Sequence, residues 1–390
     1  MMRDSRRKSI RSVRGSDDWV MIGLTALLIV FGIALLASAS SNMSESLVGD
    51  AFHYVKRQLM YGVGLGLLGF LIASRIRYQN WQRFAVPLLM LGLGLLMLTF
   101  TPLAFTAKGA SRWVAIGPFV FQPSEPLKLC FMAYLAAWLA GTKMGSRHTR
   151  AGFAAFLAII GTIMGILVAQ PATSTAVIIG TMAGIMYFAS GAKWSHIGFT
   201  IAAASACIAL LIYATPGSAP AGTDPSSKPK NYRLLRIEAF LHPEETVKGG
   251  GFQANQAKIA IGAGGLLGVG YGQSTTKLNY LPEPLGDSIF AVAGEELGFV
   301  GCMALLMLFA LLVGRIFIAA SRTREPFGHL FLVGTGSLIA LQSFVNIGAI
   351  SGVMPSTGIP LPFISYGSTG LAVFMTMIGI ANNIVKQNDA

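Results

Sequence analysis

Apolar runs of roughly 20 residues recur along the whole chain, and they constrain the possible fold more than any other feature. A helix needs about 20 apolar residues to cross the hydrocarbon core of a bilayer. The 390 residues are 53% hydrophobic and 12% charged, whereas a soluble domain carries about 25% charged residues. The sequence therefore predicts an all-α integral membrane protein.

Ten such runs can be placed along the chain. They cover residues 19–39, 57–74, 84–102, 122–140, 152–170, 174–190, 195–214, 288–313, 328–349 and 366–385. We expect about ten transmembrane helices in one domain at 19–386, with a basic tail at 1–18 and a short C-terminus at 387–390. Because no small-residue cleavage site follows the basic tail, the first run is interpreted as an uncleaved anchor rather than a signal peptide.

The segments between the runs differ in charge and length, which predicts the orientation. The short segments on one side are rich in cations such as Arg75, Arg83, Arg150 and Arg322. Under the positive-inside rule this side, with both termini, faces the cytoplasm. The long hydrophilic segment 215–286, between the seventh and eighth runs, is then extracytoplasmic, and long loops are exempt from the rule. Its cations are available to an anionic ligand: Lys228, Lys230, Arg233, Arg236, Lys248, Lys258 and Lys277.

Residues 249–272 are dense in glycine, which invites comparison with a phosphate-binding loop. They contain neither a Walker pattern nor G-x-G-x-x-G, and no strand pattern precedes them. Close packing or a re-entrant turn is therefore expected there instead of a nucleotide site. The 3 cysteines and 5 histidines lack metal-ligand spacing, and no nucleic-acid partner is expected.

Three carboxylates, Asp287, Glu295 and Glu296, stand at the threshold of the eighth run. An uncompensated charge at the bilayer centre costs about 2.5–3.5 kcal/mol, so each group needs a structural partner or a function. On one helix Glu295 would lie roughly 12 Å deeper than Asp287, which excludes a close carboxylate dyad. Asp287 is either the N-cap of this helix or a functional group. We expect one glutamate to face an interior cation and the other to face water.

A second polar cluster falls within residues 108–128, where Arg112 precedes Glu125 and Lys128. Two interpretations stay open. Glu125 and Lys128, one helical turn apart, can form an ion pair that neutralises two embedded charges. Alternatively, Arg112 and Lys128 line a cavity and hold phosphate oxygens, the arginine through its planar fork and the lysine as a point charge. Further polar groups are expected on the same outer side: Gln342, Asn346 and the proline-broken run 355–367.

Four motifs in the chain stand out: Gln122-Pro-Ser-Glu125, Tyr280-Leu-Pro-Glu-Pro284, Asp287-x-Ile-Phe-Ala-Val-x-Gly-Glu-Glu-Leu-Gly298 and Thr357-Gly-Ile-Pro-Leu-Pro-Phe-Ile-Ser-Tyr-Gly367. Together they closely resemble the SEDS family (shape, elongation, division and sporulation), the FtsW and RodA proteins. The likeness spans nearly the whole chain, and Lys56-Arg-Gln58 and Tyr232-Arg-Leu-Leu-Arg236 look closer to FtsW. The resemblance implies a peptidoglycan glycosyltransferase that polymerises lipid II at the outer face of the membrane during septal cell-wall synthesis.

The resemblance also implies roles for individual residues. Asp287 matches the family's essential loop aspartate and would be the general base toward an acceptor sugar hydroxyl. The candidate substrate-binding residues are Arg112, Glu125, Lys128, Lys277, Glu283, Ser365 and Tyr366. Cationic groups such as Arg112 and Lys128, together with a divalent ion such as Mg²⁺ or Mn²⁺ if one is required, would stabilise the leaving lipid pyrophosphate. The metal requirement stays unknown.

The implied surroundings are those of bacterial cell division. The partners would be a class B penicillin-binding protein, other divisome proteins, lipid II and undecaprenyl pyrophosphate. The location would be the bacterial cytoplasmic membrane, at the division septum.

The chain departs from the family pattern at Ala172, at Leu285 and Gly286, at Ser288, and at Ser368 and Thr369. The missing acid at Ala172 puts local hydrogen bonding or ion binding in doubt, although Asp287 is kept. Other functions stay open. A lipid II flippase also suits ten embedded helices, although no internal repeat is visible. A non-catalytic division scaffold would tolerate changes at Asp287, and a RodA-like elongation polymerase is the alternative within the family.

Overall fold

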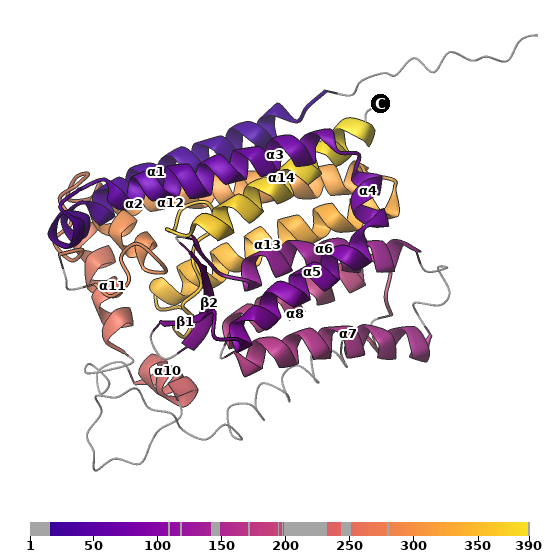
Figure 1. Ribbon diagram of the computed structural model, residues 1–390. Helices are drawn as coiled ribbons and strands as arrows, with labels where there is room; N and C mark the ends of the chain where they lie inside the picture. The colour runs from indigo at the N-terminus through magenta and orange to yellow at the C-terminus, as the bar shows by residue number, and fades with distance from the viewer. Residues whose placement is uncertain are drawn as a thin grey trace, which may run out of the picture.

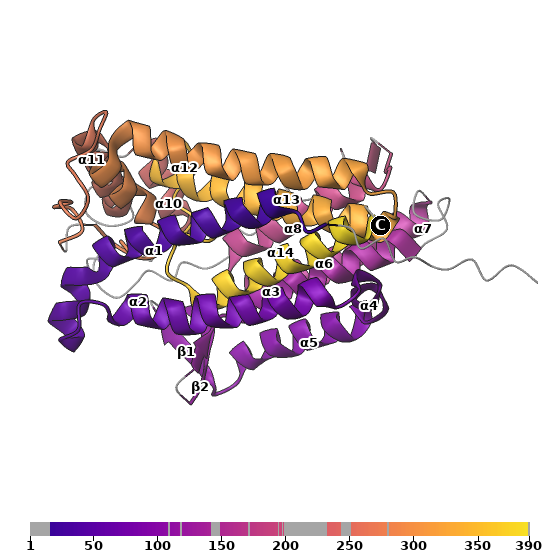
Figure 2. The same ribbon diagram turned by 90° about the horizontal axis from the view of Figure 1, so that it is seen from above.

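The computed structural model describes residues 16–388, apart from 108–109, 118, 142–148, 171, 194, 197, 199–231, 243–250 and 279–280. Long helices lie side by side in one bundle (Figure 1), and the same arrangement is seen from above in Figure 2. Two short helices and a small sheet lie at one end of this bundle.

The helices of the first half are α1 Trp19–Val48, α2 His53–Arg57, the π-helix η1 Gln58–Gly64, α3 Leu65–Arg75, α4 Tyr78–Arg83, α5 Ala85–Met97 and the 3₁₀ helix η2 Leu98–Phe100. They are followed by α6 Ser124–Gly141, α7 Arg150–Ala169, α8 Thr173–Ala189, α10 Tyr232–Leu241, α11 Phe252–Gly264, α12 Ile289–Arg322, α13 Pro326–Ile350 and α14 Ser368–Asn388. The strands are β1 Ala104–Ala107, β2 Ala110–Ile116 and β3 Phe119–Phe121.

The helices agree with the apolar runs of the sequence. Every expected span except the seventh coincides with a described helix or helical stretch, and the seventh, 195–214, lies mostly outside the described residues. Six helical segments of the described chain are long and apolar enough to cross a membrane, judged by length and composition. The protein is therefore a multi-pass, predominantly helical membrane protein, as predicted.

Three features differ from the expectation. Helix α1 continues to Val48, beyond the expected end at residue 39, and α12 continues to Arg322. Strands β1, β2 and β3 form an antiparallel sheet in that order, although only helices were expected. Helix α12 is also interrupted at Gly298, where φ is 64°.

Local signals in the sequence explain where several helices begin. Asp18 caps α1, because its carboxylate accepts a 3.1 Å hydrogen bond from the backbone N–H of Met21. Glu325 caps α13 in the same way, and Pro326 occupies the first helical position, where its missing N–H costs no hydrogen bond.

The two ends of the bundle carry different kinds of side chain. At one end, Asp17 pairs with Lys386 at 3.0 Å and Asp18 with Arg315 at 2.9 Å, which ties the start of α1 to α12 and α14. The sheet, α10 and α11 lie at the opposite end (Figure 1). The bundle thus separates the clustered basic ends of its helices from the polar loops. That the basic end faces the cytoplasm is still a prediction from charge.

Candidate functional site

Asp287 lies two residues before α12 and borders a small pocket at the end of the bundle that carries the sheet, α10 and α11. The pocket is lined by Gln253, Ala254, Asp287, Asn346, Ala349, Ile350, Ser356, Thr357, Gly358 and Ile359. The N-cap position of α12 belongs to Ser288, so the interpretation of Asp287 as the N-cap of this helix is wrong. The carboxylate belongs to a pocket wall assembled from α11, α13 and the loop that follows α13.

Asn346 fixes the backbone on both sides of this pocket. Its side-chain amide is buried in α13 and donates a 2.8 Å hydrogen bond to the carbonyl of Asp287. The same Nδ2 atom donates a 2.6 Å bond to the carbonyl of Ile359. One turn earlier on α13, Gln342 donates a 2.9 Å bond to the carbonyl of Pro360. Two buried amides therefore hold the proline-broken segment against the helix.

The turn that carries Asp287 is also held by the segment before α14. Ser365 Oγ donates a 2.7 Å hydrogen bond to the carbonyl of Gly286, and the N–H of Tyr366 donates a 2.8 Å bond to the carbonyl of Leu285. Within the turn, the N–H groups of Gly286 and Ser288 both bond to the carbonyl of Glu283. Ser365 thus supports the main chain around the carboxylate.

Tyr366 and Glu283 occupy unusual positions beside this turn. The Tyr366 ring meets Tyr54 edge to face at 5.3 Å between centroids. Glu283 has φ of 52°, a left-handed conformation that is uncommon for a residue with a side chain. Both residues shape the turn, and neither lines the Asp287 pocket.

The residues that replace the expected family side chains have contacts of their own. Ser288 Oγ accepts a 3.0 Å hydrogen bond from Gln253 Nε2, which joins α11 to the start of α12. Ser368 Oγ donates a 3.4 Å bond to Gln58 Oε1 in η1. Ala172 is buried in front of α8. Each of the two serines thus makes a polar contact around the site.

Lys128 and Glu125 form a buried ion pair on α6. The ammonium lies 2.7 Å from Glu125 Oε1 and 3.0 Å from Gln342 Oε1, and the lysine side chain is 3% exposed. The ion-pair interpretation is therefore correct for the geometry. Through Gln342, the pair is linked to the same loop that borders Asp287. Arg112 lies on β2, at the same end of the bundle, and is half-buried (Figure 1).

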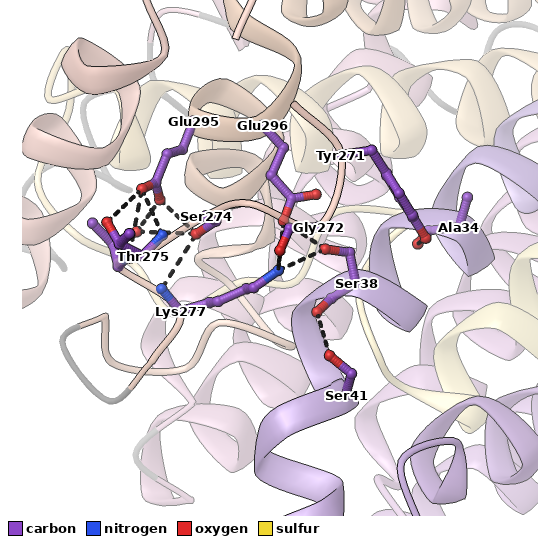
Figure 3. A network of polar contacts seen from close by, with 11 residues as sticks. Ala34, Ser38, Ser41, Tyr271, Gly272, Ser274, Thr275, Lys277, Glu295 and Glu296 are labelled. Atoms are coloured by element: carbon purple, nitrogen blue, oxygen red, sulfur yellow. Dashed lines mark hydrogen bonds and ion pairs between the residues drawn. The ribbon is translucent and has the colours of Figure 1, made fainter. Parts of the chain in front are cut away.

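Lys277 belongs to a separate buried cluster (Figure 3). Its ammonium lies 2.8 Å from Glu296 Oε1 and 2.9 Å from Ser38 Oγ, and it donates a further 2.8 Å bond to the carbonyl of Gly272. Lys277 is not among the residues that line the Asp287 pocket. The contacts of Lys277 indicate a structural role, in which it connects α1 and α12 to the loop before Asp287.

Glu295 occupies the neighbouring position in Figure 3. It is 2% exposed, so the expectation that one of the two glutamates faces water is wrong. Its carboxylate accepts hydrogen bonds from the hydroxyls of Ser274, Thr275 and Thr276 and from two backbone N–H groups of the same run. These donors satisfy a carboxylate that would otherwise be buried at high cost.

The glycine-dense segment packs its backbone directly on the interruption of α12. The N–H groups of Val269 and Gly270 donate to the carbonyls of Glu295 and Glu296, and that of Phe299 donates to the carbonyl of Gly265. A Cβ at Gly268 would clash with the carbonyl of Glu296, so only glycine allows this approach. The prediction of close packing is confirmed.

No group of three or more His, Cys, Asp or Glu side chains able to hold a metal ion occurs in the described part of the chain. Among the residues that line the pocket, Asp287 is the one carboxylate. Mg²⁺ is commonly bound by one or two carboxylates together with substrate phosphates, so Asp287 fits only an ion that also binds substrate.

Comparisons with known proteins place this arrangement in context. The FtsW/RodA/SpoVE family model, described as a cell cycle protein, matches residues 18–390. The chain is 36% identical over 368 residues to the probable peptidoglycan glycosyltransferase FtsW of Trichlorobacter lovleyi, covering 94% of this chain and 92% of that protein. It is 34% identical over 373 residues to stage V sporulation protein E of Bacillus subtilis, covering 95% and 97%.

Two solved structures share the fold. A chain of a peptidoglycan synthase complex, described for its coordination of polymerization and crosslinking, superposes with a TM-score of 0.77 at 26% identity, covering 96% of this chain and 98% of that chain. The rod shape determining protein RodA of Thermus thermophilus superposes with a TM-score of 0.68 at 25% identity, with the same coverage of 96% and 98%.

Proposed function

Because the chain belongs to the FtsW/RodA/SpoVE family of cell cycle proteins, we propose that it is a peptidoglycan glycosyltransferase that polymerises lipid II into glycan strands. The predicted likeness to the SEDS family is confirmed, and identity to the FtsW protein, at 36%, exceeds identity to RodA, at 25%. This likeness supports the proposal of an FtsW-like role in septal synthesis.

The observation that carries the proposal is the position of Asp287 in a pocket wall whose backbone is held by Asn346. Asp287 acts as the general base. It takes the proton of the acceptor sugar hydroxyl while the oxygen bonds to the anomeric carbon of the donor. The bond between that carbon and the lipid pyrophosphate breaks, and the pyrophosphate leaves with the electron pair. The donor bond is already activated, so no nucleotide is consumed.

Cationic groups near the pocket stabilise the pyrophosphate as its charge develops. Lys128 acts within its ion pair with Glu125, next to the loop that borders Asp287, and Arg112 acts from β2. A divalent ion, Mg²⁺ or Mn²⁺, would add charge neutralisation when it enters with the substrate phosphates. In the pocket, the Asp287 carboxylate would be the protein ligand that helps to hold this ion.

The partner is a class B penicillin-binding protein, which crosslinks the strands that this chain polymerises. The likeness to a chain of a synthase complex that coordinates polymerization with crosslinking supports this assignment. The membrane is the bacterial cytoplasmic membrane at the septum, with the pocket on its outer face. The clustered basic residues at the opposite end of the bundle support that orientation.

The test is a reconstitution of the purified protein with its class B partner in liposomes that contain lipid II, with transpeptidation blocked by a β-lactam. Glycan strands that appear without added nucleotide support the polymerase. Translocation of lipid II across the bilayer with no polymer would overturn it in favour of a flippase. Absence of both activities in a folded, partner-bound protein would favour a scaffold.

A further inference from the structure

A second small pocket adjoins the Asp287 pocket and shares Ala254 and Ser356 with it. It is lined by Arg236, Ala239, Phe240, Ala254, Lys258, Gly352, Met354 and Ser356. Two cations from two different helices, Arg236 of α10 and Lys258 of α11, therefore face one hollow directly beside the proposed base. No carboxylate is among the residues that line this second pocket.

Arg236 connects the two pockets through the loop after α13. Its Nη1 atom donates a 3.1 Å hydrogen bond to the carbonyl of Ser356, which holds the guanidinium on this loop. A Cβ at Gly358 would lie 3.6 Å from Arg236 Nη2 and also 3.6 Å from Asp287 Oδ2. These two atoms are thus at most about 7 Å apart, and both lie beside Gly358.

Lys258 reaches the same loop from α11 and lies over Gly352. Gly352 has φ of 78°, and a Cβ there would clash with Cε of Lys258. The absence of a side chain at Gly352 therefore makes room for the lysine. Its ammonium forms no hydrogen bond or ion pair with the described residues, and its side chain is exposed. A single exposed lysine is ordinarily only a solvated surface group.

Lys258, however, shares its pocket with a second cation, Arg236, next to the carboxylate of Asp287. Two cations placed in this way are better explained as a binding site than as solvated surface groups. We propose that Arg236 and Lys258 form an anion subsite that receives phosphate oxygens of the lipid-linked substrate next to Asp287. This inference rests on the proposed function and adds specific binding groups to it. Arginine presents a planar fork that matches phosphate oxygens, and lysine supplies a mobile point charge.

Phosphate oxygens at this position have two sources in a membrane. They belong either to the pyrophosphate of the lipid-linked substrate or to the headgroup of an anionic phospholipid. The subsite is assigned to the substrate, because it adjoins the pocket of the base rather than standing apart from it. Membranes of defined composition separate the two sources.

The kinetic experiment compares the wild type with Lys258→Gln in liposomes of phosphatidylcholine alone, with the class B partner present. We expect KM for lipid II to rise about three- to tenfold and kcat to stay within about twofold. Lys193→Gln is the matched control, since Lys193 is also exposed but follows α8 and lines neither pocket. Its KM should equal that of the wild type. An effect of Lys258→Gln that appears only after phosphatidylglycerol is added would overturn the substrate assignment.

The binding experiment does not depend on polymerisation. Inorganic pyrophosphate should raise the thermal unfolding midpoint of the detergent-solubilised wild type and of Lys193→Gln, and raise it less in Lys258→Gln and in Arg236→Gln. Gly352→Ala, which displaces the lysine without removing its charge, should also weaken the response. Equal responses in all folded variants would refute the subsite. If the wild type responds to pyrophosphate and the Lys258→Gln and Arg236→Gln variants do not, the subsite stands even when the wild type shows no polymerase activity. That outcome would refute only the proposed function.

Discussion

The side-chain amide of Asn346 donates one hydrogen bond to the carbonyl of Asp287, at 2.8 Å, and another to the carbonyl of Ile359, at 2.6 Å. One buried group of α13 therefore sets the distance between the turn that carries the carboxylate and the loop that faces it. A displacement of about 1 Å at a reacting group can lower a rate by about 100-fold. The position of Asp287 is thus set by a buried side chain of α13.

Replacement of Asn346 tests this dependence. Asn346→Ala removes the side-chain amide and with it the hydrogen bonds to the carbonyls of Asp287 and Ile359. The loss should cost about 1–3 kcal/mol of stability. It should also lower kcat for lipid II polymerisation at least about tenfold, because Asp287 moves. Ser343→Ala is the control, since Ser343 is buried on the same helix and its hydroxyl has no partner among the described residues. Wild-type kcat in folded Asn346→Ala would contradict the positioning role.

The Lys128 and Glu125 pair separates a structural contribution from a substrate contact. Lys128→Met leaves a buried carboxylate uncompensated and should cost about 3–5 kcal/mol of stability. Glu125→Gln combined with Lys128→Met should recover most of that loss, because no charge then stays buried. Thermal unfolding and polymerisation are measured on all three proteins. Continued inactivity of the stable double variant is the expected result, while full activity would show that Lys128 makes no essential substrate contact.

The Lys277 and Glu296 pair should behave in the opposite way. The pair ties α1 and α12 to the loop before Asp287, and it does not line the pocket. Lys277→Met alone should lose about 3 kcal/mol of stability. Lys277→Met with Glu296→Gln should regain both stability and a KM for lipid II close to the wild-type value. A KM that stays raised in the stable double variant would restore Lys277 to the substrate site.

The pair of Asp17 and Lys386 predicts a pH dependence of stability. Burial raises the pKa of Asp17, but hydrogen bonds from Lys386 and Asn382 and the lysine charge outweigh it and hold the pKa below its usual range. Because the folded pKa is depressed, the stabilisation is complete above the unfolded pKa, about 3.9, and is lost as the pH falls through the folded value.

Thermal unfolding in detergent at several pH values checks this sign. Asp17→Asn should be less stable than the wild type near pH 7 by about 0.5 kcal/mol, since the pair is about a third exposed. The difference should shrink as the pH is lowered below about 4. A difference that stays constant from pH 7 to pH 3 would show that the ion pair is not its cause.

The helices could be predicted from the sequence because apolar length alone places them in a bilayer. The sheet could not, because β1 and β3 are short and gain their stability only from pairing with β2. The interruption of α12 at Gly298 could not be predicted either, since it depends on the loop at 264–270 that packs against it. These features are set by contacts between segments, which no single run of residues reveals.

The sequence allowed us to predict which residues belong to the candidate site, but not which groups they contact. Gln342 and Asn346 were recognisable as polar residues one turn apart on an apolar helix, but their acceptors are carbonyls of other segments. The burial of Glu295 had a readable signal, the run Ser274-Thr275-Thr276, whose hydroxyls satisfy it. Gln253 of the pocket carried no such signal, because its role depends on where α11 lies.

Substitution of Asp287 tests most directly whether this residue is the base of a lipid II polymerase. The variants are Asp287→Asn and the control Asp50→Asn, which removes a half-buried carboxylate paired with Lys56. Each is purified with the class B partner, checked for folding, and supplied with lipid II while transpeptidation is blocked. Wild type and Asp50→Asn should produce glycan strands, and Asp287→Asn should be slower by about 100-fold or more. Strand synthesis by folded Asp287→Asn at the wild-type rate would contradict the account.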